Sequence, residues 1–106
     1  MHDSYISVVV PVYREQRAIH DFLTHIGQVF SAAGHEVIVV DGSPGLETIA
    51  AVHDPDIKAV ASAPGRSRQM NHGASLAQGD ILLFVHADTR LPEHAPDLIL
   101  QTVKEE

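Results

Sequence analysis

The feature that most constrains the fold is a regular alternation of short apolar runs with amphipathic helical stretches. The apolar runs are residues 5–12, 36–41, 57–61 and 81–86, and the helical stretches are 15–32, 44–53, 67–78 and the segment that follows Pro92. The order is therefore βαβαβαβα. Such an order predicts an α/β fold with a mostly parallel sheet of about four strands, flanked by helices.

Details within this pattern indicate where the elements end and which sides are buried. Three of the predicted strands are almost continuously apolar, as expected for strands covered on both faces. In the helix over 67–78, Met70, Ala74 and Ala77 lie on one side, and Pro92 suits the first turn of the last helix. No linker or repeat interrupts the pattern, so residues 1–106 are predicted to form a single domain.

Composition excludes several classes of function. The chain has no cysteine, which rules out disulfides, thiolate metal sites and a cysteine nucleophile. Its net charge of −7 argues against nonspecific binding to nucleic acid. The eight histidines are scattered, with no pair at the H-x-x-x-H spacing of a zinc site. The sequence shows neither a secretory signal nor an apolar window of about 18 residues. The lack of cysteine suits the cytoplasm, so we expect a cytoplasmic protein, with peripheral membrane association left open.

Polar residues follow each predicted strand. The four segments are Pro-Val-Tyr-Arg at 11–14, Asp-Gly-Ser at 41–43, Gly-Arg-Ser-Arg at 65–68 and His-Ala-Asp-Thr-Arg at 86–90. In open parallel sheets, ligands bind beyond the carboxyl ends of the strands. The sequence therefore predicts a ligand site built from these four segments.

Two of the segments point to a nucleotide, although each has a structural alternative. Asp41 is placed to accept hydrogen bonds from a ribose or base, or else to cap its own Asp-Gly-Ser turn. Arg66 and Arg68 precede a helix whose amide groups favour phosphate, or else form a solvated basic loop; Asn71 follows one turn later. Binding of NAD or FAD is not expected, because no glycine-rich turn follows the first strand.

The segment at 86–90 predicts a metal or ligand contact. His86 and Asp88 are alternate residues at the end of a strand, so both are expected on one face. A carboxylate together with phosphate oxygens suits Mg²⁺ or Mn²⁺, and an imidazole suits Mn²⁺ somewhat better. The structural alternative is a polar cap on a buried strand.

These segments resemble the N-terminal half of family 2 glycosyltransferases, which have the Rossmann-like GT-A fold. The matching pieces are SVVVPVYRE at 7–15, VVDGS at 39–43, NHGA at 71–74 and GDILLFVHAD at 79–88. More narrowly, residues 64–71 and 86–92 are similar to a branch of small bacterial members associated with radical-SAM, selenodomain or arsenosugar pathways. The similarity spans the whole chain in the right order.

The resemblance implies a donor site for a nucleotide-diphosphate sugar, with a UDP-sugar favoured, and transfer of the sugar with inversion. The residues implied in nucleotide binding are Pro11, Val12, Tyr13, Glu15, Asp41, Arg66, Arg68, Asn71 and Ala87. Asp88 matches the last aspartate of the D-x-D motif, which holds Mn²⁺ or Mg²⁺ on the diphosphate. His86 replaces the first aspartate of that motif, and Met70 stands where many members have an arginine before the asparagine.

Family members are usually much longer, and their remaining half carries the acceptor site and the catalytic base. We therefore expect the base to lie outside this chain, and the chain alone to bind donor weakly and transfer little sugar. The predicted strand at 81–86 would lie near an exposed edge, to be covered by that missing half or by a second copy in a homo-oligomer.

Other functions remain open from the sequence. A non-catalytic nucleotide-binding or assembly module would keep the donor half alone. A nucleotidyltransferase would need a Gly-rich basic loop after the first strand, and a response-regulator receiver would need an acidic pair there. The Pro-Val-Tyr-Arg segment fits neither of these last two classes.

Overall fold

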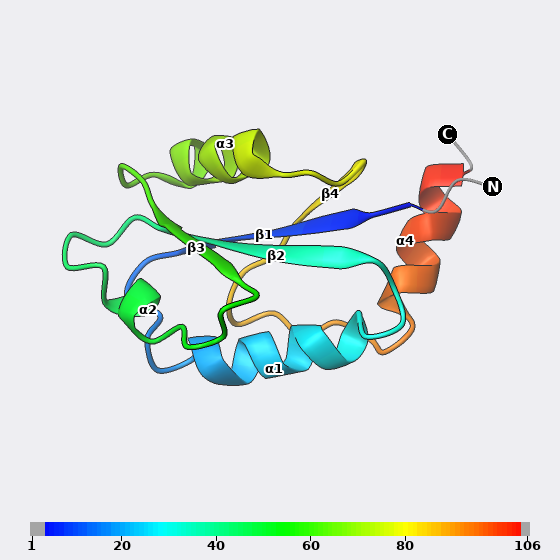
Figure 1. Ribbon diagram of the computed structural model, residues 1–106, viewed down its shortest axis with the longest axis horizontal. Coiled ribbons are helices and arrows are strands. Elements are labelled where there is room, and N and C mark those ends of the chain that lie inside the picture. The colour runs from blue at the N-terminus through cyan, green and yellow to red at the C-terminus, as the bar shows by residue number, and fades with distance from the viewer. Residues whose placement is uncertain (1–3, 105–106) are drawn as a thin grey trace.

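The chain forms a sheet of four parallel strands that is covered by helices on both faces (Figure 1). The computed structural model describes residues 4–104. The elements are β1 (Ile6–Val12), α1 (Ile19–Val29), β2 (His35–Asp41), α2 (Glu47–Ala50), β3 (Lys58–Ala61), α3 (Arg66–Leu76), β4 (Ile81–Phe84) and α4 (Ala95–Lys104). The predicted α/β class, element order and strand count are confirmed.

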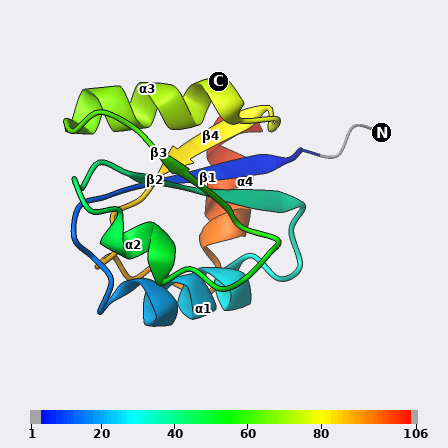
Figure 2. The same cartoon turned by 60° about the vertical axis from the view of Figure 1, so that its left-hand side comes forward.

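In the strand order β3-β2-β1-β4, the side of the sheet on which the chain adds strands changes once, between β3 and β4. This change is the reversal of the strand order. The chain steps outward from β1 to β2 and β3 through α1 and α2, which lie on one face of the sheet (Figures 1 and 2). It then crosses back through α3 on the other face to place β4 against the free side of β1. The carboxyl ends of β1 and β4 therefore border the point where the strand order reverses.

The core lies on both faces of β1 and β2. On one face, Val8 and Val10 belong to the larger cluster with Phe22 and Ile26 of α1. On the other face, Val9 packs with residues of β2 beneath α3. The two central strands are buried on both sides, which confirms the interpretation of their continuous apolar runs. The same interpretation is wrong for the third continuously apolar run, β4, because α3 leaves one of its faces uncovered.

Helix α3 approaches the sheet through Gly73 and Gln69, its two buried residues. A Cβ at position 73 would lie 2.4 Å from Cγ1 of Val9 and 3.0 Å from Cγ2 of Val40. The predicted apolar side with Met70 and Ala74 is thus only half-buried, because the close approach of the backbones selects the smallest residue instead.

Several elements are shorter than predicted. Helix α1 begins at Ile19, after a turn in which the Glu15 carbonyl accepts the Ala18 and Ile19 N–H groups. Helix α2 spans four residues, and β4 ends at Phe84. Pro92 lies before α4 in a turn closed by the Ala95 N–H, and it is Pro96 that occupies the first helical turn.

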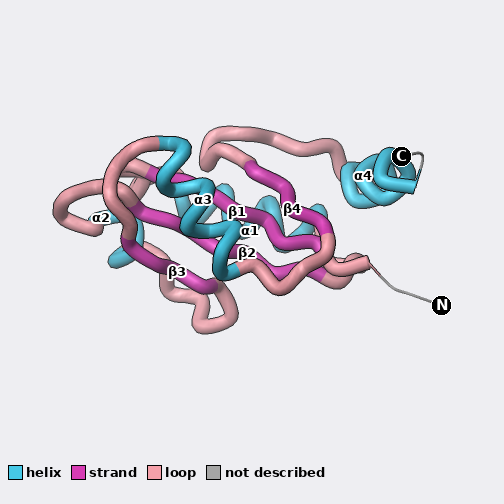
Figure 3. The backbone as a smooth tube through the Cα atoms, turned by 90° about the horizontal axis from the view of Figure 1, so that it is seen from above, coloured by secondary structure: helices cyan, strands magenta, loops and turns pink. Residues whose placement is uncertain are grey.

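Strand β4 lies at an edge of the sheet, as predicted, and part of its surface is exposed. Leu82 and Phe84 are 45% and 39% exposed. Both pair in register with β1 residues on the face that carries α3, but α3 lies over β1 and β2 and leaves them uncovered. Seen from above, α4 lies beyond the start of β4, at the end of the molecule opposite the carboxyl ends (Figure 3).

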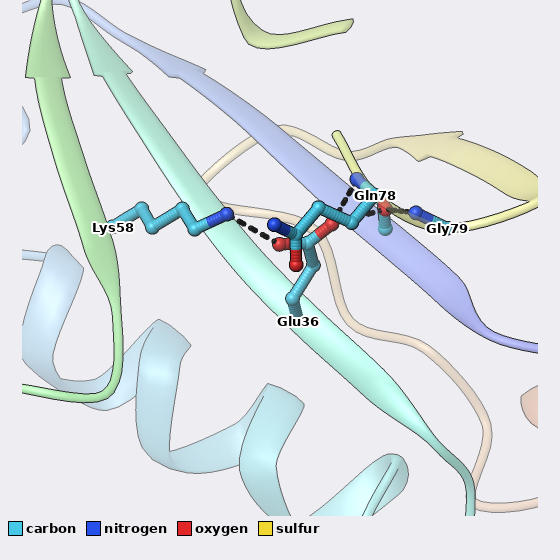
Figure 4. A network of polar contacts seen from close by, with 5 residues as sticks. Glu36, Lys58, Gln78 and Gly79 are labelled. Carbon is cyan, nitrogen blue, oxygen red and sulfur yellow. Dashed lines mark hydrogen bonds and ion pairs between the residues drawn. The ribbon is translucent and has the colours of Figure 1, made fainter. Parts of the chain in front are cut away.

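A polar network at the amino ends of the strands centres on Glu36 (Figure 4). Its carboxylate accepts hydrogen bonds from the Ser7 hydroxyl (2.6 Å) and the Gln78 N–H (2.6 Å), and pairs with Lys58 Nζ (3.0 Å). The Gly79 N–H donates to Ser7 Oγ at 2.8 Å. One carboxylate therefore joins β1, β2, β3 and the loop that leads into β4.

The pKa of Glu36 reflects this network. Burial acts to raise the pKa, but the hydrogen bonds from Ser7 and Gln78 and the charge of Lys58 outweigh it, so the pKa lies below its ordinary value. A depressed carboxyl pKa stabilises the fold above the unfolded-state pKa. That contribution is lost as the pH falls through the folded-state pKa.

We predict that Glu36→Gln lowers the free energy of unfolding by about 1–2 kcal/mol near neutral pH, because charge-assisted hydrogen bonds are replaced by weaker ones. The difference from the wild type should shrink as the pH falls through the acidic range, where the native Glu36 protonates. Urea denaturation at several pH values measures this. A difference that is the same at every pH would contradict the assignment.

We predict that Gly73→Ala lowers the free energy of unfolding by about 1–3 kcal/mol, because the added methyl group has no room against Val9 and Val40. Gly27→Ala on α1 is the matched control, since a Cβ there meets nothing within 4 Å. The control should raise stability by up to about 1 kcal/mol through helix propensity. Equal effects of the two substitutions would argue against the tight α3 contact.

Candidate functional site

The candidate site lies where β1 and β4 part at their carboxyl ends. The β1–β4 ladder ends at the pair Val9 and Phe84, whereas the β1–β2 ladder continues to Val12 and Asp41. The half-buried Pro11 lies just past the end of β4. The Val9 carbonyl still accepts the Val85 N–H, but the next β1 residue on that side is Pro11, which has no N–H to donate, and the β1–β4 ladder ends there.

Tyr13 and Arg14 form a projecting turn directly after β1. Tyr13 is 47% exposed, and the Arg14 guanidinium lies 5.5 Å from the centre of its ring. Arg14 adopts a left-handed conformation with φ 54°. The following residue, Glu15, is half-buried, and its N–H donates to Oγ1 of Thr48 at 2.8 Å. The turn thus presents an aromatic ring and a cation at the reversal point.

Asp41 lies at the end of β2 and is fully buried. Its Oδ1 accepts hydrogen bonds from the Ser43 N–H (2.8 Å) and from the Ser43 hydroxyl, and its Oδ2 accepts one from the Ile49 N–H (3.1 Å). The carboxylate therefore braces its own turn and the start of α2, in agreement with the structural alternative. Contact between Asp41 and a nucleotide stays a prediction.

Arg66 and Arg68 lie exposed in the first turn of α3, and Asn71 is exposed one turn later. Among the described residues, neither arginine pairs with a carboxylate. Gly65 precedes the helix with φ 129°, a conformation that favours glycine. Exposed guanidinium groups and helix N–H groups together form an arrangement that suits an anion.

Gln69 joins this helix to the strands. No sequence motif identified it as a site residue. Its side-chain NH₂ donates to the carbonyls of Val12 (2.8 Å) and Val40 (2.9 Å), and its Oε1 accepts from the Gly65 N–H (3.3 Å). It is 5% exposed. The start of α3 is thereby fixed beside the carboxyl ends of β1 and β2, which brings Arg66 and Arg68 toward the Tyr13 turn.

His86 and Asp88 lie in a turn closed by a hydrogen bond from the Thr89 N–H to the His86 carbonyl (3.0 Å). Strand β4 ends at Phe84, so these residues lie after the strand. Both side chains are exposed, whereas Ala87 between them is buried.

Asp88 also borders an open hollow of about 180 Å³ between its turn and the start of α1. The lining residues are Ala18, Asp21, Phe22, Ala87, Asp88, Thr89 and Arg90. Asp21 is a second carboxylate at this hollow, and no motif in the sequence marks it as a site residue. No group of three or more metal-binding side chains occurs within residues 4–104, so a cation at Asp88 would need further oxygens from its ligand.

The arginines have similar places along the chain. Every arginine of the chain lies in a segment that follows the carboxyl end of a strand: Arg14, Arg17, Arg66, Arg68 and Arg90. The chain as a whole carries a net charge of −7. Guanidinium groups gathered at one edge of an acidic protein favour a ligand with phosphate groups.

Comparison with known proteins agrees with this geometry. Residues 7–106 match the family model described as glycosyl transferase family 2. A mannosyltransferase from Pyrobaculum calidifontis, solved in complex with GDP-Man and Mn²⁺, is structurally similar, with a TM-score of 0.72 and 28% sequence identity. The match covers 98% of this chain and 32% of the mannosyltransferase. No curated protein sequence matches the chain significantly. Within the described residues, no helix is both long and apolar enough to cross a membrane.

We predict that Asp41→Asn lowers the free energy of unfolding by about 1–3 kcal/mol. An amide NH₂ cannot accept the bonds that Ser43 and Ile49 donate, so at least one buried donor loses its partner. Thermal and urea denaturation measure the loss. An exposed aspartate such as Asp56 provides the control, and Asp56→Asn should change stability by less than about 0.5 kcal/mol. Equal stability of the two variants would contradict the bracing role.

Proposed function

The chain belongs to glycosyl transferase family 2, and we propose from this that it binds a nucleotide-diphosphate sugar at the carboxyl edge of its sheet. The observation that carries the proposal is that two features flank the segment after β1. Gln69 holds the start of α3 beside the end of β1, and Asp88 borders a hollow with Ala18, at the start of α1. The basic helix start and the carboxylate thus lie on opposite faces of the sheet, with the Tyr13 turn at the strand end between these two elements.

We assign the nucleotide to the Tyr13 side of this site. The ring of Tyr13 offers a flat apolar surface for a base, and the backbone of Pro11 and Val12 lies beside it. Arg66 and Arg68 at the start of α3 would hold phosphate, with Asn71 nearby. Glu15, Asp41 and Ala87 complete the proposed nucleotide site: Glu15 and Asp41 are bonded into the turns that form it, and Ala87 lies beneath the Asp88 turn.

A divalent cation fits the Asp88 turn only together with a diphosphate. The side chains of Asp88 and His86 are exposed and of types that can bind a metal ion. Mg²⁺ or Mn²⁺ is commonly bound by one or two carboxylates together with substrate phosphates. When bound, such an ion neutralises charge that develops on the leaving diphosphate. The Mn²⁺ in the complex of the similar mannosyltransferase supports this assignment.

The acceptor and the catalytic base are proposed to lie outside this chain. Displacement with inversion needs a base within hydrogen-bond reach of the acceptor hydroxyl. The chain spans 32% of the similar mannosyltransferase, which leaves ample sequence there for an acceptor site. A strand from such a segment, or from a second copy, would cover the outer edge of β4 with its exposed Leu82 and Phe84.

Calorimetric titration with UDP and GDP, with and without Mn²⁺, tests the donor site. We predict binding that Mn²⁺ strengthens, and a loss of affinity of about tenfold or more in Asp88→Ala, because a metal ligand is removed. Asp56→Ala is the matched control, since it removes an exposed carboxylate at the opposite end of the sheet. The family resemblance implies UDP, while the mannosyltransferase complex holds GDP-Man, so the two titrations also decide the base.

Metal-independent binding, unchanged by Asp88→Ala, would remove the metal from the proposal. No binding of either nucleotide to the folded protein would overturn the donor site. The alternative of a non-catalytic assembly module would then be favoured, and the limited share of the mannosyltransferase that this chain matches is consistent with such a module.

A further inference from the structure

We propose that Thr48 and Gln69 are positioning residues that clamp the Tyr13–Arg14 turn in the shape that receives a nucleotide base. This inference rests on the proposed function for its ligand. It rests on the hydrogen bonds of the buried side chains for its geometry. Neither residue touches the proposed ligand position itself, so each acts through the turn.

The two residues hold the turn on both sides. The Gln69 side-chain NH₂ donates to the carbonyl of Val12, immediately before the turn, at 2.8 Å. Oγ1 of Thr48 accepts the N–H of Glu15, immediately after the turn, at 2.8 Å. Gln69 comes from α3 and Thr48 from α2, which lie on opposite faces of the sheet (Figures 1 and 2). Only Tyr13 and Arg14 project between the two fixed points.

Without the hydrogen bonds from Gln69 and to Thr48, the turn is expected to relax to another conformation. Arg14 holds a left-handed conformation that costs free energy in any residue other than glycine or asparagine. Tyr13 leaves almost half of its surface in water. Neither residue receives a side-chain hydrogen bond within the described part of the chain that would hold it. The backbone is therefore kept in place from its two ends.

Both clamping side chains are anchored in turn. Thr48 is fully buried, and the short helix that carries it is held by the bond from the Ile49 N–H to Oδ2 of Asp41. Gln69 is 5% exposed and also bonds the carbonyl of Val40 and the N–H of Gly65. The same glutamine thus supports the turn proposed for the base and the helix start proposed for phosphate, whereas Thr48 supports the turn alone.

This difference gives a specific expectation for Thr48. Thr48→Val keeps the shape of the side chain but removes the acceptor of the Glu15 N–H. Affinity for UDP or GDP, whichever the wild type binds, should fall by up to about tenfold, because binding must then restore a turn shape that this hydrogen bond maintained in the free protein. Affinity for Mn²⁺–pyrophosphate, which lacks a base, should stay within about twofold. Thr48→Ser, which retains the acceptor, should bind like the wild type.

The experiment combines titration with amide hydrogen exchange measured by NMR. Thr24→Val on α1 is the control, since the Thr24 hydroxyl donates only to a carbonyl of its own exposed helix turn. Exchange at the Glu15 amide should be faster in Thr48→Val and unchanged in Thr24→Val and Thr48→Ser. In a Tyr13→Ala background, Thr48→Val should cause little further loss of nucleotide affinity. If Thr48→Val does not fold, Thr48→Cys, whose thiol is only a weak acceptor, serves the same comparison.

Unchanged nucleotide affinity, or an equal loss for pyrophosphate, would overturn the positioning role, because general loosening of the fold affects both ligands. If the folded wild type binds neither nucleotide, the proposed function fails, and so does the assignment of the turn to a nucleotide base. Exchange at Glu15 still decides the clamp in that case: faster exchange in Thr48→Val supports it, and an unchanged rate overturns it.

Discussion

Helix α3 lies so close to β1 and β2 that position 73 has no space for a side chain, and much of the remaining structure depends on this contact. The close approach brings Gln69 within reach of two strand carbonyls at once. It also sets the helix start beside the end of β1. If α3 were further from the sheet by the width of a methyl group, Gln69 could no longer reach the carbonyls of Val12 and Val40 together.

The alternation of apolar runs and helices was sufficient to predict the class and order of elements, because strands buried on both faces have few alternatives. The position of the segments after the strands was equally predictable, because the carboxyl ends of parallel strands lie at one edge of the sheet. Helix ends were predicted less well. Glu15 begins a turn rather than α1, and a left-handed Leu46 delays α2.

The supporting residues of the site could not be predicted in this way. Gln69 and Thr48 are polar residues within helices, and nothing local distinguishes them from solvated positions. Their burial and partners arise from contacts with strands and turns far away in the sequence. Asp41 shows the same limit: the sequence allowed a ligand contact or a turn brace, and only the folded chain shows a carboxylate that three donors already surround.

The two ladders of β1 differ in length, and this makes the chain unequal in its resistance to local opening. The β1–β2 ladder joins seven pairs of residues, and the β1–β4 ladder joins four. Segments held by fewer pairs open at lower free energy than the rest of a domain. The turn with Asp88 follows the shorter ladder, so a ligand bound at this turn would raise the free energy needed to open β4. The order of β4 and of this turn would then depend on whether the ligand is bound.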